Sequence, residues 1–482
     1  MASRSWTLSR SSALLVVATL LVVVVPAGSA SAVPANFNIS QRPGNEAEDA
    51  IAINPANPSN IVAMSTLPGP VSGLFEGVSF DGGLTWTRRI IGDGDQLGEI
   101  CCDQQLSWDA FGNLWMVYLF SGSNGHVPIA LSTNGGLTFQ KVAEIVPTKP
   151  KGIGPSGNIG SKGNGASVKG VASADQPSIS AGAGSVWVSY TSYPAVVIQG
   201  SGAEVTGLGQ FGDFSTPETV PTSRGVGNFG GTAVGPDGQV MAIYQDQSAG
   251  QGGARIYTAL DLDGLGPDGF GEPRFFARTR VGGFDYLPVQ PDRSVDAEAN
   301  LAWDRSGGAH DGRVYAIWTQ EVKNESNDMD IMLRHSDDDG GTWSSVRRLN
   351  DDATANSQVN PAIAVDQTTG AVAASWYDAR NDLGAGGPGD NDGVPNDDVQ
   401  TWATYSTNGG STFAPTFQVS EGTSNSSVGV TGSGFNLGDY TEAAFEAGNF
   451  YPAWSDNSNS TGDNPDGTLH QLDLYTAKIT IA

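Results

Sequence analysis

Short apolar segments recur along the whole chain, and residues that favour turns separate them. Arg313–Trp318 and Ala371–Trp376 are representative, with mostly apolar side chains and with glycine just before each segment. Segments of this length that are rich in β-branched and aromatic residues are typical of strands. After residue 32, no long segment shows the 3.6-residue period of an amphipathic helix. The pattern therefore predicts an all-β protein.

One composite pattern, an apolar strand with a polar start, a tight turn and a second strand, occurs seven times. The first strands of these pairs are expected at 48–53, 103–108, 175–180, 228–234, 299–303, 360–365 and 439–445. Hairpins repeated in this way are typical of a β-propeller, which can hold a chain of this length as one domain. We expect a single propeller domain over 33–482, built of four-stranded blades, with seven blades preferred and six as the alternative.

The blade boundaries follow from the repeat. The blades are expected near 47–91, 102–146, 174–220, 227–277, 296–349, 358–420 and 438–482. The last of these shows only three strands, so we expect 36–39 at the N-terminus to supply its fourth. Such a closure would remove the open edge of the sheet.

An eight-residue motif, Ser-x-Asp/Asn-x-Gly-x-Thr-aromatic, occurs four times, at 79–86, 132–139, 336–343 and 406–413. Each copy lies between two strands, so we interpret it as a hairpin turn. Its Asp or Asn oxygen accepts backbone N–H bonds and its glycines supply positive φ. The aromatic residue is expected to pack between neighbouring sheets. Because the second and fourth copies carry Asn, the charge is not required, and we assign the motif a structural role.

The N-terminus has the features of a secretory signal peptide. Arg4 and Arg10 precede the apolar run Ala13–Val25, and the small residues Ala30-Ser31-Ala32 follow it. The run is short for a membrane span, and no later segment is as apolar. We therefore expect cleavage after Ala32 and a secreted protein without membrane insertion.

The composition adds a strong negative charge. The chain has 24 basic and 51 acidic residues, a net charge of -27. Loss of the two arginines before residue 32 would leave 22 basic residues against the 51 acidic ones, a net charge of -29. Such a charge repels nucleic acid and anionic membranes. We expect neither as a partner, and we expect a monomer.

The two cysteines, Cys101 and Cys102, are adjacent. Consecutive Cα atoms lie about 3.8 Å apart, closer than the Cα atoms of ordinary disulfides. The sequence leaves open whether the pair forms a strained disulfide or stays as two buried thiols.

The propeller topology predicts which face carries function. The turn motifs join the two outer strands of a blade, so they lie opposite the face where the inner strands begin. That second face surrounds the channel mouth, the usual concavity of a propeller. The inner-strand starts place there Glu46, Glu48, Asp49, Asp103, Gln104, Asp175, Gln176, Asn228, Asp296, Glu298, Asn300, Gln358, Asn360, Asp439, Tyr440 and Glu442. The second-strand ends add Asp246, Glu321, Asp378, Arg380 and Asp456, and the segments upstream of inner strands add Arg42 and Arg293.

Carboxyl groups that converge on a cleft are what the hydrolysis of a glycosidic bond requires, one as acid and one as base or nucleophile. Crowding of like charges raises some of their pKa values toward neutrality. The carboxyl groups that we consider for these roles are Asp49, Asp103, Glu298 and Glu442. Asp378 and Gln104 on the same face are candidates for substrate binding. For any single residue, a structural hydrogen bond across the channel is the competing interpretation.

A segment with many acidic residues, 384–398, contains Asp390, Asp392 and Asp397 around glycines. This density of carboxylates resembles a calcium loop, although it does not complete the EF-hand spacing. Calcium is therefore a candidate ligand, a solvated acidic loop is the alternative, and no other cofactor is expected.

The chain resembles the sialidase-like Asp-box β-propeller proteins, also called bacterial neuraminidase repeat proteins. The resemblance rests on the four turn motifs and on second strands that end in Trp376-Tyr377-Asp378 and Trp454-Ser455-Asp456. It covers essentially all of 33–482 and implies the propeller fold. Its members include hydrolases, lyases, receptors and scaffolds, and the family sialidases have six blades.

In sialidases of this family a Tyr assisted by a Glu is the nucleophile, an Asp is the acid or base, and three arginines hold the substrate carboxylate. The matching residue types are Tyr440 with Glu442, Asp49 or Asp103, and Arg42, Arg293 and Arg380. The family's Phe/Tyr-Arg-Ile-Pro motif is absent, with Gln41-Arg42-Pro43 in the comparable region.

Three functions remain open. The favoured one is a secreted sialidase-like glycoside hydrolase that acts on an extracellular glycan, in its narrowest form an exo-α-sialidase. The alternative is a non-catalytic propeller that binds glycan, protein or calcium. A polysaccharide lyase would need a Lys, His or Tyr base beside an Arg or a cation. Convergence of the three arginines on one Tyr–Glu pair would distinguish the first function from the second.

Overall fold

A computed structural model describes residues 1–2, 33–68, 72–121, 125–148, 173–223, 225, 227–246, 250–428 and 435–481. The chain divides into two units, Met1–Ala32 and Val33–Ala482. The expected signal peptide lies almost entirely outside the described residues, as does its cleavage site after Ala32. Within the described residues, no helix has the length and hydropathy that crossing a bilayer would require.

The second unit is a seven-bladed β-propeller, and the described residues contain strands but no helix. Blade 1 consists of β2 (Ala47–Ile53), β3 (Ile61–Thr66), β4 (Leu74–Ser79) and β5 (Thr87–Ile91). Blade 2 consists of β7 (Gly98–Trp108), β8 (Leu114–Phe120), β9 (Val127–Ser132) and β10 (Gln140–Ile145), with β6 (Asp93–Asp95) paired to β7. Blade 3 consists of β11 (Ser173–Gly182), β12 (Ser185–Tyr193), β13 (Val197–Gly207), β14 (Gln210–Phe211) and β15 (Glu218–Thr219). Blade 4 consists of β16 (Asn228–Val234), β17 (Val240–Gln245), β18 (Ala254–Asp261) and β19 (Arg274–Thr279).

The second half of the ring repeats this plan after a separate hairpin. That hairpin consists of β20 (Asp285–Leu287) and β21 (Gln290–Val295). Blade 5 consists of β22 (Asn300–Trp303), β23 (Val314–Glu321), β24 (Met329–Ser336) and β25 (Arg347–Arg348). Blade 6 consists of β26 (Gln358–Val365), β27 (Val372–Asp378), β28 (Asp398–Ser406), β29 (Phe417–Gln418) and β30 (Ser424–Asn425). Blade 7 consists of β31 (Ala443–Glu446), β32 (Asn449–Asp456), β33 (Asp473–Ala477), β34 (Ile479–Thr480) and β1 (Asn36–Asn38).

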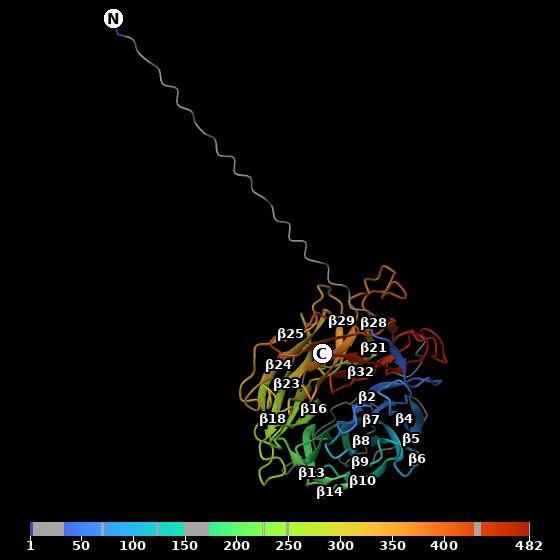
Figure 1. Cartoon of the computed structure of the whole chain (residues 1–482), viewed down its shortest axis with the longest axis vertical. Helices are drawn as coiled ribbons and strands as arrows, with labels where there is room; N and C mark the ends of the chain where they lie inside the picture. Colours follow the sequence, from blue (N-terminus) through green and yellow to red (C-terminus); the bar gives the residue numbers. More distant parts are fainter. Residues whose placement is uncertain are drawn as a thin grey trace. The chain divides into compact units, whose positions relative to one another are not determined.

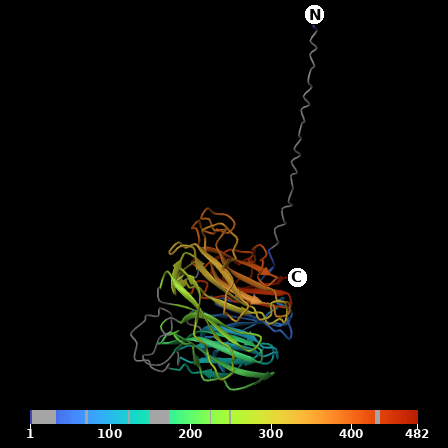
Figure 2. The ribbon, with the colours of Figure 1, turned by 90° about the vertical axis from the view of Figure 1, so that its left-hand side faces the viewer.

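The inner strands form a closed ring. In chain order they are β2, β7, β11, β16, β22, β26 and β31; each contacts the next, and β31 contacts β2. Figure 1 shows the colours of the sequence following one another around this ring, and Figure 2 shows the same succession of blades from the side. The preferred count of seven blades is confirmed, and the six-bladed alternative is wrong.

The N-terminal strand closes the ring, as expected from the missing fourth strand of the last blade. β1 pairs with β33, with Asn36 opposite Ala477 and Asn38 opposite Tyr475. The side-chain amide of Asn38 donates a hydrogen bond of 2.5 Å to Asp473 Oδ2. The outer edge of blade 7 is therefore covered by the start of the domain.

The apolar core lies between the blades. Seven clusters of buried apolar side chains occur, and each spans one interface between neighbouring blades. The largest fully buried side chains include Trp115, Trp187, Trp303, Trp318, Trp376 and Trp454. A blade has two apolar faces and therefore needs a neighbour on both sides, which only a closed ring provides for every blade.

The turn motifs lie on the face opposite the inner-strand starts. In the third copy, Ser336 Oγ accepts a hydrogen bond of 2.9 Å from the Gly340 N–H, and Asp338 Oδ1 accepts one of 2.7 Å from the Thr342 N–H. Asn134 and Asn408 accept the equivalent backbone bonds in the second and fourth copies. The amide oxygen thus replaces the carboxylate oxygen, which agrees with a structural role.

Each motif also joins its blade to the preceding one. Asn60 of blade 1 donates to the carbonyl of Gly135 in the second copy, and Tyr451 of blade 7 donates to that of Gly82 in the first. The aromatic residues pack in the same interfaces: the ring of Trp343 lies 4.7 Å from that of Phe276 in blade 4. The prediction that these rings pack between sheets is confirmed.

We expect Asp338→Asn to leave the melting temperature nearly unchanged, because Asn supplies the same acceptor in two other copies. Asp338→Ala removes the acceptor for two bonds from Thr342, and should lower the melting temperature by a few degrees. Differential scanning calorimetry of both variants measures the two effects. Equal losses in the two variants would show that the charge itself stabilises the turn.

Candidate functional site at the channel mouth

Polar residues in an unusual backbone conformation mark the start of five inner strands. Glu48, Asp103, Gln176, Glu298 and Asn360 occupy equivalent positions and have positive φ angles of 61°, 57°, 44°, 38° and 50°. In blades 1, 2, 3 and 6 the pairing register shifts at this point, which is a β-bulge. A non-glycine residue in the left-handed region costs of order 1 kcal/mol. Because this backbone strain recurs around the ring, the channel mouth is the candidate functional site.

Arg293 lies in the middle of the carboxyl groups that these strands bring together. It belongs to β21, the hairpin outside the blades, and its Nη2 lies 2.9 Å from Glu48 Oε1 of blade 1. Its Nε donates a hydrogen bond of 2.5 Å to Asp439 Oδ1, just before blade 7. The side chains of Arg293 and Asp439 remain about one-fifth exposed, at 20% and 19%. The ion pair therefore lies at the solvent-facing end of the cluster.

Six carboxyl groups interact electrostatically around this one guanidinium: Glu48, Asp103, Asp175, Asp296, Glu298 and Asp439. Burial, and after it the charges of their neighbours, raises the pKa of Asp103 to about 7 and that of Glu48 to about 8. The same causes raise the pKa of Asp296 to about 8 and move that of Glu298 well above its usual range. The mouth therefore combines an ion pair with carboxyl groups whose pKa values are raised into the neutral range.

Sequence reasoning placed all six groups on this face but singled out only Asp103 and Glu298 as catalytic. The other four gain their importance from Arg293, the cation that they share. Arg293 lies on the hairpin β20–β21, which has no counterpart in the repeat pattern. A signal was present in the sequence, since Arg293 is the only basic residue between 281 and 304.

Two of the other candidates connect blades. Asp49 accepts hydrogen bonds of 2.7 Å from Ser65 of blade 1 and Ser455 of blade 7. Gln104 accepts one of 2.9 Å from Thr66 and donates one of 2.5 Å to the Glu48 carbonyl. Burial raises the pKa of Asp49 to about 7, and the two serine bonds oppose the increase.

In the expected tyrosine–glutamate pair, Tyr440 is buried and Glu442 is half-buried, and no hydrogen bond joins them. Tyr440 is 4% exposed, and its hydroxyl has no hydrogen-bond partner among the described residues. Burial raises the pKa of Glu442 to about 8, and a backbone bond from Ile51 lowers it in part. The negative charge of Glu442 contributes to raising the pKa of Tyr440, so the two groups are near each other but not bonded.

The three candidate arginines have no partner in common. Arg42 pairs with Glu46, whereas Arg293 pairs with Glu48 and Asp439. Arg380 pairs with Asp378 and Asp351, at 2.7 and 3.0 Å, and its guanidinium lies 3.9 Å from the centre of the Trp402 ring. The arrangement of three arginines around one anion is therefore not formed. Asp378 and Arg380 form a local ion pair of blade 6.

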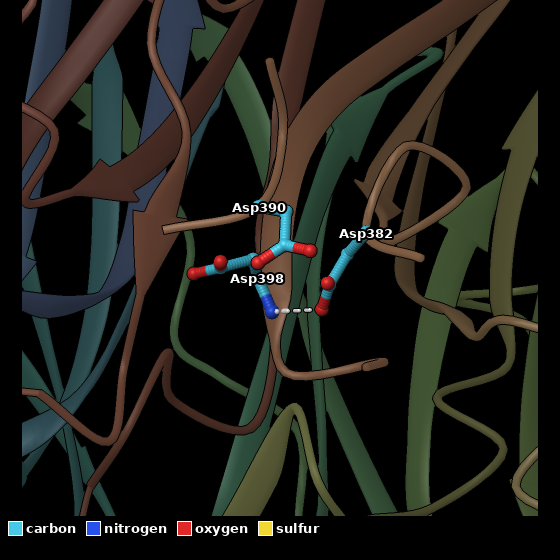
Figure 3. Close-up of side chains that lie close together, drawn as sticks. All are labelled: Asp382, Asp390 and Asp398. Atoms are coloured by element: carbon cyan, nitrogen blue, oxygen red, sulfur yellow. Dashed lines mark hydrogen bonds between the residues drawn. The ribbon is translucent and has the colours of Figure 1, made fainter. Parts of the chain in front are cut away.

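The acidic residues of the predicted calcium loop lie between β27 and β28. Two sets of three carboxylates occur there, Asp382 with Asp390 and Asp398, and Asp392 with Asp397 and Asp398. Within each set, one oxygen per residue lies within 4.8 Å of the others. Figure 3 shows the first set, with the carboxylate of Asp390 between the other two. The three residues named from the sequence thus belong to two sets that share Asp398.

Two further features lie elsewhere. Cys101 and Cys102 form a disulfide in β7, directly before Asp103, with Cα atoms 3.8 Å apart. Cavities of about 400 and 570 Å³ lie against outer strands, between blades 4 and 5 and between blades 2 and 3. No carboxylate lines either cavity, so neither is a candidate for acid–base chemistry.

Comparisons with known proteins identify the fold. No protein-family model matches the sequence, and no curated protein matches it. Among solved structures, the BP39L lectin from Burkholderia pseudomallei is 12% identical, over 92% of this chain and 97% of that chain, with a TM-score of 0.50. The endosialidase of phage phi92 is also 12% identical, over 93% and 69% of the two chains, with a TM-score of 0.47. The α-L-arabinofuranosidase Arb93A from Fusarium graminearum is 13% identical, over 72% and 93%, with a TM-score of 0.43. At these identities the similarity concerns the fold alone.

We expect the free energy of unfolding to fall as the pH rises from about 5 to about 8. Unfolded carboxyl groups have pKa values near 4, whereas those at the mouth are raised to about 6 to 8. The folded state therefore holds more protons over this range, and its stability falls as they dissociate. Urea unfolding at several pH values measures the effect, and a stability that increases over the range would contradict it.

Arg293→Met should make this pH dependence steeper. The substitution leaves Glu48, whose pKa is raised to about 8, without its cation, so it should cost about 3 kcal/mol or more at pH 8 and less at pH 5. Arg334→Met is the matched control, because Arg334 donates to backbone carbonyls of Ser344 and Trp343. The loss of stability in Arg334→Met should not vary with pH. A loss of stability that is equal in both variants and constant with pH would contradict the role given to Arg293.

Proposed function

We propose that this protein is a secreted glycoside hydrolase of the Asp-box propeller type, and that it cleaves an extracellular glycan at the channel mouth. One observation carries the proposal: carboxyl groups with raised pKa values surround the Arg293–Asp439 ion pair at the exposed end of the channel. Glycosidic cleavage needs a protonated carboxyl group to protonate the leaving oxygen and a carboxylate to stabilise or attack the sugar carbon.

Within this proposal the partly exposed carboxyl groups carry out the reaction. Glu298, whose pKa burial and the charge of Asp296 raise, is the proton donor to the glycosidic oxygen. Asp439, paired with Arg293, is the carboxylate that stabilises the positive charge developing on the sugar ring. Asp103 and Glu48 lie deeper and maintain the electrostatic environment.

The exo-α-sialidase form of the proposal is narrower. It requires a cationic pocket for the substrate carboxylate, and Arg293 is the one candidate arginine that pairs with carboxylates of the mouth. Arg42 and Arg380 have other partners. A sialoside therefore belongs in the substrate panel as one member among neutral and acidic glycans.

A non-catalytic glycan-binding propeller is the second candidate. The observation in its favour is that several mouth carboxylates already bind neighbouring blades, as Asp49 binds Ser65 and Ser455 and Asp103 accepts the Gln176 N–H. Residues held in this way give the channel a fixed polar rim, which is sufficient for binding without turnover.

Assay of the secreted protein on a panel of aryl glycosides, sialosides and polysaccharides tests the proposal. On any substrate that is cleaved, Glu298→Gln and Asp439→Asn should each lower kcat by about 10²- to 10⁴-fold. Asp338→Asn, on the opposite face, should leave kcat unchanged. Absence of turnover on every substrate, together with binding on a glycan array, would reject the hydrolase and support the second candidate.

A further inference from the structure

The loop between β27 and β28 concentrates negative charge without a basic residue of its own. Asp382, Asp390, Asp392 and Asp397 lie in it, Asp398 begins β28, and 381–400 contains no Lys or Arg. The preceding Arg380 pairs with Asp378 and Asp351 instead. No ion pair involves any of the five carboxylates among the described residues. Other groups must therefore compensate their charge.

Backbone amides compensate the first set. Asp382 Oδ2 accepts hydrogen bonds of 2.8 and 2.9 Å from the N–H groups of Asp397 and Asp398. Asp390 accepts three, of 2.6, 2.8 and 2.7 Å, from the N–H groups of Ala385, Gly386 and Gly393. These carboxylates act as the acceptors that shape the loop, and their hydrogen bonds account for their position.

In the second set this compensation is only partial. Asp398 accepts hydrogen bonds from the backbone N–H and the side-chain amide of Asn391, and Asp392 Oδ1 accepts one from the Val394 N–H. Asp397 is 8% exposed, and its Oδ1 is buried without a hydrogen-bond donor among the described residues. Its carboxylate lies with those of Asp392 and Asp398, one oxygen of each within 4.8 Å of the others. The side-chain amide of Asn425 lies beside them, and its contact with Asp397 lowers the pKa of that carboxyl, against the larger effects of burial and of the neighbouring carboxylates. A buried carboxylate oxygen that faces two further carboxylates needs a positive partner.

We propose that Asp392, Asp397 and Asp398 bind a calcium ion. The set offers oxygen ligands and no His or Cys, which favours a hard cation over zinc. Asp392 is exposed while the other two are buried, so one side is open to water molecules that complete the coordination. Calcium accepts an irregular, partly hydrated shell of this kind, whereas magnesium demands near-octahedral geometry.

Binding here would fix the loop to its surroundings. Asp398 begins β28, and the backbone N–H groups of Asp397 and Asp398 bond to Asp382 after β27. Asn396, next to the set, donates to the Asn327 carbonyl of blade 5 and accepts from the Ser357 N–H of blade 6. The ion would therefore tie both ends of the loop to two neighbouring blades. The loop leaves the blade on the same side as the channel mouth, because β27 ends beside the start of β26.

Isothermal titration of the metal-free protein with calcium chloride tests the proposal. We expect binding with a Kd of about 10⁻⁴ to 10⁻³ M, and a melting temperature a few degrees higher in calcium than in EDTA. Proteolysis within 383–395 should slow when calcium is added. Magnesium at the same concentration should give a smaller effect.

Three variants locate the site. Asp397→Asn should weaken calcium binding at least about tenfold, while Asp338→Asn, in a turn on the opposite face, should bind as the native protein does. Asp390→Asn should bind calcium within a fewfold of the native affinity. If calcium gives the native protein no heat of binding and no change in melting temperature, the proposal is overturned. Native affinity in Asp397→Asn, or loss of binding in Asp390→Asn alone, would overturn the assignment to this set. An equal response to magnesium would overturn the choice of calcium.

Discussion

The structure depends on the burial of both faces of every blade against its neighbours. Each of the seven apolar clusters spans an interface between two blades, so no blade has a core of its own. Apolar burial, at roughly 25 cal/mol per Å², is therefore gained only between blades. This coupling makes the ring the unit of stability, and it explains why the turn motifs are placed to bond the preceding blade.

The same packing crowds acidic side chains together at the channel mouth. Inner strands that meet around one axis bring Glu48, Asp103 and Glu298 close to one another, whatever their charges. All three residues have positive φ angles at the start of their strands. One guanidinium, carried by a hairpin that belongs to no blade, compensates only part of the charge. Protonation compensates the rest, so the chemistry of the mouth follows from the geometry of the fold.

Much of the fold follows from the sequence, because a repeat reports the same structure several times. The inner strands and the turn motif each recur in the sequence. The closing strand at 36–39 was predicted because the last blade lacked a fourth strand. The site is harder to predict from the sequence, because it depends on the positions and partners of individual side chains. Arg380 was expected at the mouth from its place after a strand, but it pairs with Asp378 and with Asp351, which precedes the blade. Arg42 was similarly expected there but pairs with Glu46 only four residues away. Asp398 ends the acidic segment but was not among the predicted calcium ligands, because its place in both sets depends on the path of the backbone.

The pairing of β1 with β33 has a consequence for how the chain reaches its native state. Asn38 and Asp473, which hydrogen-bond across this pair, are 435 residues apart. The first strand to leave the ribosome thus has no partner until almost the last strand has emerged. Contacts of such sequence separation form late, since the entropy of closing the loop is lost before the contact is gained. During that interval blade 1 also lacks its neighbour on one side, and its apolar face toward blade 7 remains in water. The pairing of β33 with β1 therefore completes blade 7 and closes the ring in one step.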